Sequence, residues 1–234
     1  MFRRSAGAPW RSLTLVEKYT GLLIDFGGVL TTSLGDAFRA FCEREGIQWE
    51  RLEATMIEAY RDVRPDSVVA RVETGHSDRE EFERFLAEAL SEGRDSPLDA
   101  QDLIVRMLAD IRMDDDMVEA VRTARRRGVR TGLLSNSWGV DYYPRDLLAE
   151  LFEEVVISGE VGMRKPDPEV FRSAAGGLGL PPEACVFVDD IRANVEASER
   201  VGMRGVLHER AAETIPTLEE LLGVSLRGVG RLES

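Results

Sequence analysis

Polar side chains able to do chemistry follow several short apolar runs of this 234-residue sequence. They are an aspartate after the first run, a serine and an asparagine after the second, a lysine before a helix-starting Asp-Pro pair, and two aspartates after a later run: Asp25, Ser135, Asn136, Lys165, Asp189 and Asp190. In an open α/β sheet, ligands bind beyond the carboxyl ends of the strands. We therefore expect these groups to converge on one edge of a sheet.

Such a site has a definite chemistry. The carboxylates of Asp25, Asp189 and Asp190 would repel one another unless a hard cation lay between them, and Mg²⁺ with oxygen ligands suits that place. Once the charge is neutralised, Asp25 can attack phosphorus and form an acyl phosphate, which splits one hard displacement into two easier ones. The hydroxyl, amide and amine of the other three residues can then hold the remaining phosphoryl oxygens.

The elements that must position these groups alternate between strands and helices. Apolar runs rich in aliphatic and β-branched residues predict strands buried on both faces, the last a weaker candidate: residues 21–26, 129–135, 155–158, 185–190 and 204–208. A helical pattern over residues 114–127 begins with acidic residues, ends with arginines and stops at Gly128. The alternation predicts an α/β fold with a doubly wound parallel sheet.

One stretch breaks the alternation, because the patterns between about residues 34 and 111 are helical throughout. We interpret this stretch as an inserted α-helical cap subdomain, with hinges at residues 31–35 and 111–116. The predicted division of the chain has a flexible leader, a core in two pieces, the cap and a tail: residues 1–19, 20–33 with 112–222, 34–111, and 223–234.

Charge and composition argue against several classes of function. The formal net charge of −13 repels a polyphosphate backbone, so we expect no nucleic-acid partner. No apolar stretch approaches the roughly 18 residues that span a bilayer, so we expect no membrane partner and a cytoplasmic location. Cys42 and Cys185 match no metal-ligand spacing and are expected to be buried apolar residues. His76 and His208 are expected to lie outside the catalytic machinery.

Four segments resemble the sequence motifs of the haloacid dehalogenase (HAD) superfamily, in the order expected for it: DFGGVLTT, LLSNS, GMRKPDP and VFVDD. The helical stretch between the first two resembles that superfamily's C1-type cap, and the likeness spans residues 21–208. The resemblance implies a Rossmann-like core and a Mg²⁺-dependent phosphatase that hydrolyses a small phosphorylated metabolite.

The resemblance also implies metal ligands. Asp25 would be both nucleophile and ligand, and the backbone carbonyl of Gly27 would be a further ligand. Asp189, Asp190 or both would hold Mg²⁺ directly or through water. Adjacent strand residues point to opposite faces, so one aspartate of the pair can bind the metal while the other caps the next helix.

Phosphate binding is the role that the resemblance gives to Ser135 and Lys165, with Asn136 beside them. Lys165 would also orient the nucleophile. Two neighbouring residues have open interpretations. Trp138 either lines the substrate pocket or anchors its loop, and Arg164 either adds positive potential near the phosphate or forms a surface ion pair.

Gly27 departs from the pattern of the superfamily's phosphatases, which usually carry at this position an aspartate that protonates the leaving group. A positioned acid contributes about 10²–10⁴ in rate. The leaving group can need little protonation, as in an acyl or anomeric phosphate, and sugar-phosphate phosphatases with this glycine exist. Alternatively, Asp36 or a water substitutes, or the protein binds a phosphorylated ligand without efficient turnover. A mutase shares every site residue, whereas a dehalogenase would give Mg²⁺ ligands no role.

Overall fold

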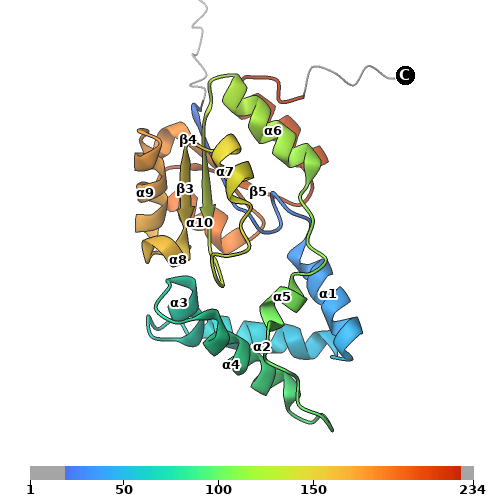
Figure 1. Ribbon diagram of the computed structural model, residues 1–234. Helices are drawn as coiled ribbons and strands as arrows, with labels where there is room; N and C mark the ends of the chain where they lie inside the picture. Colours follow the sequence, from blue (N-terminus) through green and yellow to red (C-terminus); the bar gives the residue numbers. More distant parts are fainter. Residues whose placement is uncertain (1–18, 228–234) are drawn as a thin grey trace, which may run out of the picture.

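The computed structural model describes residues 19–227. A five-stranded sheet with helices on both faces forms one part, and a block of five helices lies beyond one end of the sheet (Figure 1). The predicted leader lies outside the described residues apart from Tyr19, as do residues 228–234 of the predicted tail. No helix of the described part is both long enough and apolar enough to cross a membrane.

The sheet has the strand order β3-β2-β1-β4-β5, and every neighbouring pair of strands is parallel. The strands are β1 (Gly21–Ile24), β2 (Arg130–Ser135), β3 (Glu154–Ile157), β4 (Cys185–Asp189) and β5 (Arg204–Leu207). Each begins within one residue of its predicted run. The predicted α/β class with a parallel sheet is therefore confirmed.

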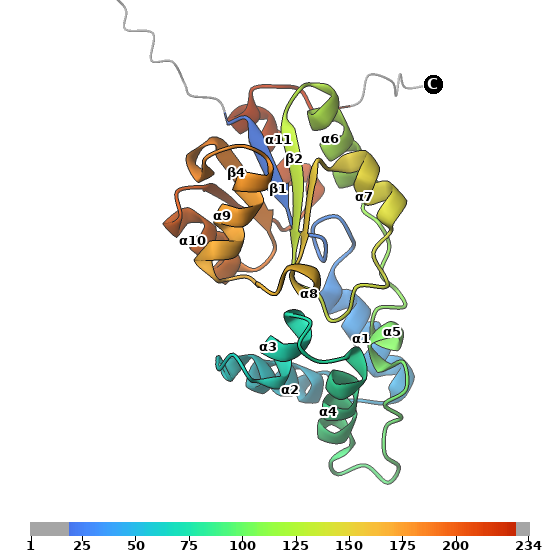
Figure 2. The same ribbon diagram turned by 60° about the vertical axis from the view of Figure 1, so that its left-hand side comes forward.

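Helices cover both faces of the sheet (Figure 2). One layer contains α6 (Asp115–Arg126), α7 (Arg145–Leu151) and α11 (Ala211–Leu222), and the other contains α9 (Pro168–Gly177) and α10 (Arg192–Arg200). Two short helices complete the core: α8 (Ser158–Val161) and the 3₁₀ turn η1 (Pro182–Ala184). Adjacent strand residues point to opposite faces, so Leu22 packs in the apolar cluster of the first layer and Leu23 in that of the second. Burying one such leucine contributes about 1.5–3 kcal/mol.

The remaining helices, which we call the helical block, follow β1 in the chain. They are α1 (Leu34–Glu45), α2 (Trp49–Arg61), α3 (Val68–Glu73), α4 (Arg79–Ser91) and α5 (Leu103–Met107). Side chains of Ser33, Ser67 and Asp78 accept backbone N–H groups at the first turns of α1, α3 and α4. The block has its own apolar cluster, which includes Phe41 and Phe82.

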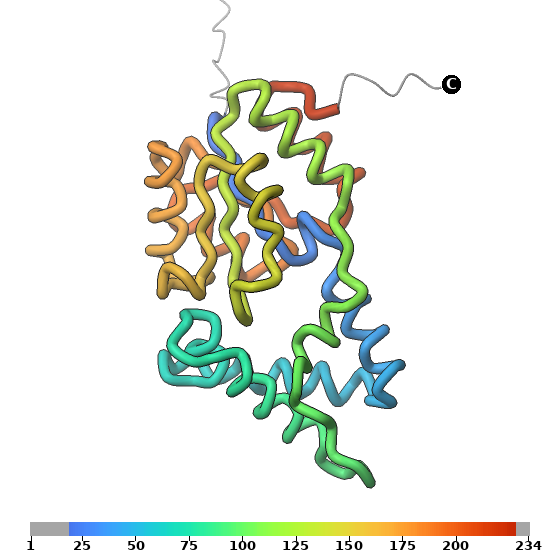
Figure 3. The backbone as a smooth tube through the Cα atoms, viewed as in Figure 1, coloured from blue at the N-terminus to red at the C-terminus, as the bar shows by residue number. Residues whose placement is uncertain are grey.

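The chain passes twice between the sheet and the helical block, at residues 30–32 and 112–114, and these two segments lie side by side (Figure 3). Thr31 and Met113 form an antiparallel bridge. The N–H of Thr32 donates to the carbonyl of Arg112 at 2.8 Å, and the N–H of Asp114 donates to the carbonyl of Leu30 at 2.9 Å. These segments overlap the predicted hinges, and both the hinge motion and the division into domains stay predictions.

The first residues of the predicted tail contact the core. Leu226 is buried in the apolar cluster that contains α11. Its backbone N–H donates to the Glu219 side chain at 2.8 Å. Leu226 therefore holds the start of the predicted tail against the core. Both cysteines, Cys42 and Cys185, are buried free thiols, as predicted.

Candidate active site

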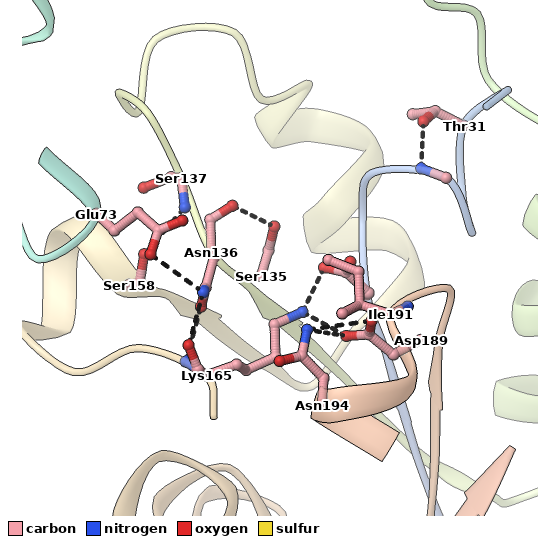
Figure 4. A network of polar contacts seen from close by, with 12 residues as sticks. Thr31, Glu73, Ser135, Asn136, Ser137, Ser158, Lys165, Asp189, Ile191 and Asn194 are labelled. Carbon is pink, nitrogen blue, oxygen red and sulfur yellow. Dashed lines mark hydrogen bonds and ion pairs between the residues drawn. The ribbon is translucent and has the colours of Figure 1, made fainter. Parts of the chain in front are cut away.

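Lys165 lies between two buried carboxylates at the carboxyl edge of the sheet. Its Nζ is 2.8 Å from Asp25 Oδ1 and 2.7 Å from Asp189 Oδ2 (Figure 4). Asp25 directly follows β1, Asp189 ends β4, and the pairing of these two strands brings the aspartates together. The N–H of Asp25 also donates to the carbonyl of Val188 at 3.0 Å, which continues the strand pairing into the site.

Asn136 fixes the backbone of Lys165. Its Oδ1 accepts the N–H of Lys165 at 2.8 Å, and its Nδ2 donates to the carbonyl of Lys165 at 2.9 Å. This reciprocal pair joins the loop after β2 to the segment between α8 and α9. Two of the residues predicted to bind phosphate are therefore in direct contact.

Ser135 ends β2 and is buried. Its hydroxyl lies 2.8 Å from the hydroxyl of Tyr143, and the Tyr143 ring packs against Phe26 with a centroid distance of 4.8 Å. Burial raises the pKa of the Tyr143 hydroxyl well above its usual range, so this group is neutral and can donate. The sequence analysis missed Tyr143. The adjacent pair Tyr142-Tyr143 in a loop that leaves a strand end was the available signal.

The two adjacent aspartates have different surroundings. Asp189 accepts hydrogen bonds from Lys165, from the N–H of Ile191 at 2.7 Å, and from the Asn194 side chain at 3.2 Å on each oxygen. Asp190 Oδ1 is buried and has no hydrogen-bond partner among the described residues. A spare carboxylate oxygen is what a metal ligand needs. The geometry therefore favours Asp190 as the direct ligand and Asp189 as the residue that holds the lysine and the start of α10.

The three aspartates fit a hard cation. One carboxylate oxygen from each of Asp25, Asp189 and Asp190 lies within 4.8 Å of the others. Burial, partly offset by Lys165 and reinforced by Asp189, raises the pKa of Asp25 to about 7. Burial and the charge of Asp189 raise the pKa of Asp190 to about 6. A divalent cation would remove the repulsion, and oxygen donors are those that Mg²⁺ prefers.

The glycines after Asp25 allow close approach. Gly28 has a φ of 73°, and a Cβ at this position would clash with Oδ2 of Asp190. A Cβ on Gly27 would meet Cδ1 of Leu34 at 3.0 Å. The apolar side chain of Leu34 therefore borders the place where a leaving-group acid would stand. The predicted metal contact of the Gly27 carbonyl stays a prediction.

Trp138 and Arg164 both contact the helical block. The Nε1 of Trp138 donates to the hydroxyl of Tyr60 at 3.1 Å, and its ring packs against Phe82 with a centroid distance of 5.5 Å. This supports the interpretation that Trp138 anchors its loop. Arg164 Nη1 contacts Glu73 Oε2 at 2.6 Å. Because Glu73 is buried, this ion pair is not the surface pair that was one of the two expectations.

Three other residues considered in the sequence contribute no side chain to the cluster of aspartates. The ring of His76 contacts the Thr74 hydroxyl, and the buried ring of His208 contacts the Thr214 hydroxyl, both at 2.9 Å. Asp36 is exposed in the first turn of α1. None of these side-chain contacts involves a clustered carboxylate, although the backbone N–H of His208 donates to the carbonyl of Asp189 at 2.9 Å.

Comparison with known proteins gives a family and several relatives. Residues 19–202 match the family described as haloacid dehalogenase-like hydrolase. A phosphoserine phosphatase of Thermus thermophilus is 36% identical over 137 residues, which cover 55% of this chain and 54% of that protein. A phosphatase of Mycobacterium tuberculosis is 34% identical over 122 residues, which cover 49% and 56%. Bifunctional epoxide hydrolase 2 of Sus scrofa is 27% identical over 183 residues, which cover 72% and 33%. The alignments thus span about a third to just over half of these relatives.

Solved structures share the fold. A HAD-like family hydrolase of Porphyromonas gingivalis superposes with a TM-score of 0.61 at 22% identity, over 88% of this chain and 98% of that one. A HAD family enzyme of Bacteroides thetaiotaomicron, solved with magnesium and inorganic phosphate, superposes with a TM-score of 0.55 at 20% identity, over 82% and 94%. At these identities the likeness establishes the fold alone.

Magnesium should raise the midpoint temperature of unfolding more at pH 8 than at pH 5.5. The raised pKa values of Asp25 and Asp190 mean that the folded protein retains protons which the unfolded chain releases above about pH 4, so these two groups lower stability as pH rises toward 7. A cation binds the ionised carboxylates and offsets this loss. Thermal unfolding with and without MgCl₂ measures the effect, and Asp190→Asn should reduce it. An equal magnesium shift at both pH values would contradict this site.

Gly28→Ala should abolish the stabilisation by magnesium. Both the positive φ and the approach of Asp190 exclude a side chain here. Gly128→Ala is the matched control, because Gly128 also has a positive φ, of 87°, but a Cβ there would have no neighbour within 4 Å. Both variants should lose about 1–2 kcal/mol from backbone strain. In calorimetry, only Gly28→Ala should lose the rise in unfolding temperature that magnesium causes. Retention of that response would show that Gly28 does not shape the cation site.

Proposed function

Because the chain belongs to the haloacid dehalogenase-like hydrolases, we propose that it is a Mg²⁺-dependent phosphatase that hydrolyses a small phosphorylated metabolite through an aspartyl-phosphate intermediate. The observation that carries the proposal is the buried contact of Lys165 with Asp25 and Asp189, beside the unpaired oxygen of Asp190. Relatives that are phosphatases by name, in Thermus and Mycobacterium, support a phosphate ester as the substrate.

Asp25 is the nucleophile in this proposal. One carboxylate oxygen attacks phosphorus in line, the bond from phosphorus to the leaving oxygen breaks, and an acyl phosphate forms. Water then attacks the same phosphorus, which restores the carboxylate and releases inorganic phosphate. The contact at 2.8 Å with Lys165 orients the attacking carboxylate. Burial lowers the pKa of Lys165, but the charges of Asp189 and Asp25 outweigh it and hold the pKa above its usual value, so the amine stays cationic.

Asp25 and Asp190 would hold Mg²⁺, with the Gly27 carbonyl as a further ligand and Asp189 close by. When bound, the ion supplies positive charge that neutralises the clustered carboxylates and the phosphoryl oxygens. The chain itself contributes fixed donors for the other phosphoryl oxygens. The Ser135 hydroxyl lies 2.8 Å from the Tyr143 hydroxyl and donates to the Asn136 carbonyl at 3.3 Å, and in this proposal it turns its proton to the phosphoryl oxygen when phosphate binds.

In our proposal the helical block acts as the cap, with the boundaries predicted from the sequence. It lies beyond the carboxyl ends of the strands, where the aspartates cluster (Figures 1 and 2). Leu34, at the start of α1, contacts the loop that carries Gly27. A cap at this edge excludes water from the reacting groups and selects the leaving group of the substrate.

The apolar neighbour of Gly27 favours one class of leaving group. Leu34 borders the place where the leaving-group acid of related phosphatases would stand, and Asp36 is exposed on α1. A leaving group that is a weak base, as in an anomeric or acyl phosphate, needs no such acid. The same observation supports a second candidate function, a protein that binds a phosphorylated ligand and turns it over poorly.

Asp25→Asn should lower the rate of aryl phosphate hydrolysis by at least about three orders of magnitude, because the amide cannot act as the nucleophile. An aryl phosphate is a suitable probe since its leaving group is a weak base. Initial rates with Mg²⁺ and with EDTA measure the effect. Asp167→Asn is the control, because Asp167 lies two residues from Lys165 but only caps α9. Full activity of Asp25→Asn would refute the role of Asp25.

Gly27→Asp combined with Leu34→Ala should raise the rate of alkyl phosphate hydrolysis about 10²-fold, since it adds the missing acid and makes room for it. Aryl phosphate hydrolysis should change little. Gly27→Asp alone should gain less, because its Cβ meets Leu34 at 3.0 Å. Steady-state rates on both esters test this. No gain, together with a wild-type protein inert on a broad panel of phosphorylated metabolites, would instead favour the binding function.

A further inference from the structure

Glu73 carries a carboxylate from the helical block into the interface with the core. It is the last residue of α3 and is only 1% exposed. An unpaired buried charge costs several kcal/mol, so the groups that compensate Glu73 decide what it does. The proposed function does not use this residue.

Two of the three donors to Glu73 come from the core. The hydroxyl of Tyr60, within the block, donates at 2.6 Å. Arg164 Nη1 donates at 2.6 Å and Asn136 Nδ2 at 3.4 Å (Figure 4). Arg164 precedes Lys165, and Asn136 follows Ser135. One cap carboxylate therefore contacts both loops that carry the proposed phosphate-binding residues.

A continuous chain of contacts leads from Glu73 to the nucleophile. Asn136 donates to Glu73 and also exchanges two hydrogen bonds with the backbone of Lys165. Lys165 in turn contacts Asp25. A displacement of Glu73 removes one restraint on the Asn136 amide, and this amide fixes the lysine that faces the reacting group.

A second docking contact lies two residues away. Gly75 has a φ of 70°, and a Cβ there would clash with the carbonyl oxygen of Gly159 at α8. Gly159 is joined to the loop that follows Ser135 and Asn136, because its N–H donates to the Ser137 hydroxyl at 3.2 Å and the N–H of Ser137 donates to the Ser158 hydroxyl at 2.9 Å. Figures 1 and 2 both show α3 next to α8. Residues 73–75 therefore dock the helical block onto the loops of the site.

We propose that Glu73 is a positioning residue that holds Asn136 and Arg164 in the phosphate-binding arrangement when the helical block is docked. The inference rests on the proposed phosphatase function. When the block moves away, water must replace both core donors on Glu73, and the two loops lose their common partner. Phosphate then binds more tightly when the helical block is docked. Because the two equilibria are coupled, bound phosphate favours the docked state by the same factor.

Two variants perturb this contact by different means. Glu73→Gln keeps the shape but removes the charge that faces Arg164, and Gly75→Ala forces the docked backbones apart without touching a polar side chain. Glu83→Gln is the control for the first, since Glu83 is also buried but its polar partners among residues 19–227 lie in the block: Ile104 N at 3.0 Å and Arg79. Gly46→Ala is the control for the second, since Gly46 has a φ of 63° and no neighbour within 4 Å of a Cβ.

Both test variants should bind inorganic phosphate, in the presence of Mg²⁺, about tenfold more weakly than wild type. They should raise KM for an aryl phosphate more than they lower kcat, and their Mg²⁺ affinity should stay unchanged. Both controls should keep the phosphate affinity of wild type. Calorimetry with inorganic phosphate measures the affinity without turnover, and a merely structural role for Glu73 would not move it.

Separate outcomes identify which idea fails. If wild type neither binds inorganic phosphate nor hydrolyses the aryl ester, the proposed function is refuted, and this inference is refuted with it. If wild type does both, and the Glu73 and Gly75 variants match their controls, the positioning role is overturned and the phosphatase stands. Should one test variant fail to fold, the other decides, because the two act on different groups.

Discussion

One buried amine faces more negative charge than it can neutralise, and this imbalance governs the site. Lys165 contacts Asp25 and Asp189, and Asp190 lies close enough for the three carboxylates to offer oxygens within 4.8 Å of one another. Three ionised carboxylates and one ammonium leave an excess of two negative charges in a region that water barely reaches. Burial first, and then the charge of Asp189, raise the pKa of both Asp25 and Asp190, so both carboxylates are costly to ionise without a cation. A divalent cation would balance the excess charge.

The sheet topology brings these charges together. β1 is the central strand, with β4 on one side and β2 on the other, so the segments that leave these three strands meet at one edge. The chain leads from β1 to β2 on one side of the sheet and from β4 to β5 on the other, so the edge between β1 and β4 is the switch point at which α/β sheets bind ligands. Glycine at position 28 completes the arrangement, because any side chain there would collide with Asp190.

The strands, and the edge of the sheet where the candidate site lies, were predictable from the sequence because they depend on local patterns of apolar and polar residues. Residues 185–188 are all apolar because both sheet faces are covered, and the two aspartates that follow mark the strand end. Helix α11 was not predicted, and Pro216 in its interior obscures the helical pattern. The contacts of Glu73 with Asn136 and Arg164 join residues 63 and 91 positions apart, and no periodicity encodes them. Leu34 beside Gly27 was missed because only the folded chain brings the two together.

Two kinds of contact hold the helical block against the core, and they differ in what they specify. The ring of Trp138 stacks on Phe38 with a centroid distance of 6.0 Å, an apolar contact that tolerates small shifts. The ion pair of Glu73 and Arg164 requires one geometry, and buried pairs contribute little net stability because desolvation offsets their attraction. The aromatic contact therefore helps to hold the helical block against the core, and the ion pair fixes the position of the block on the core. Because Ser135 ends the strand that leads into the loop of Trp138, a block docked out of register would disturb the hydroxyl that we propose faces the phosphoryl group.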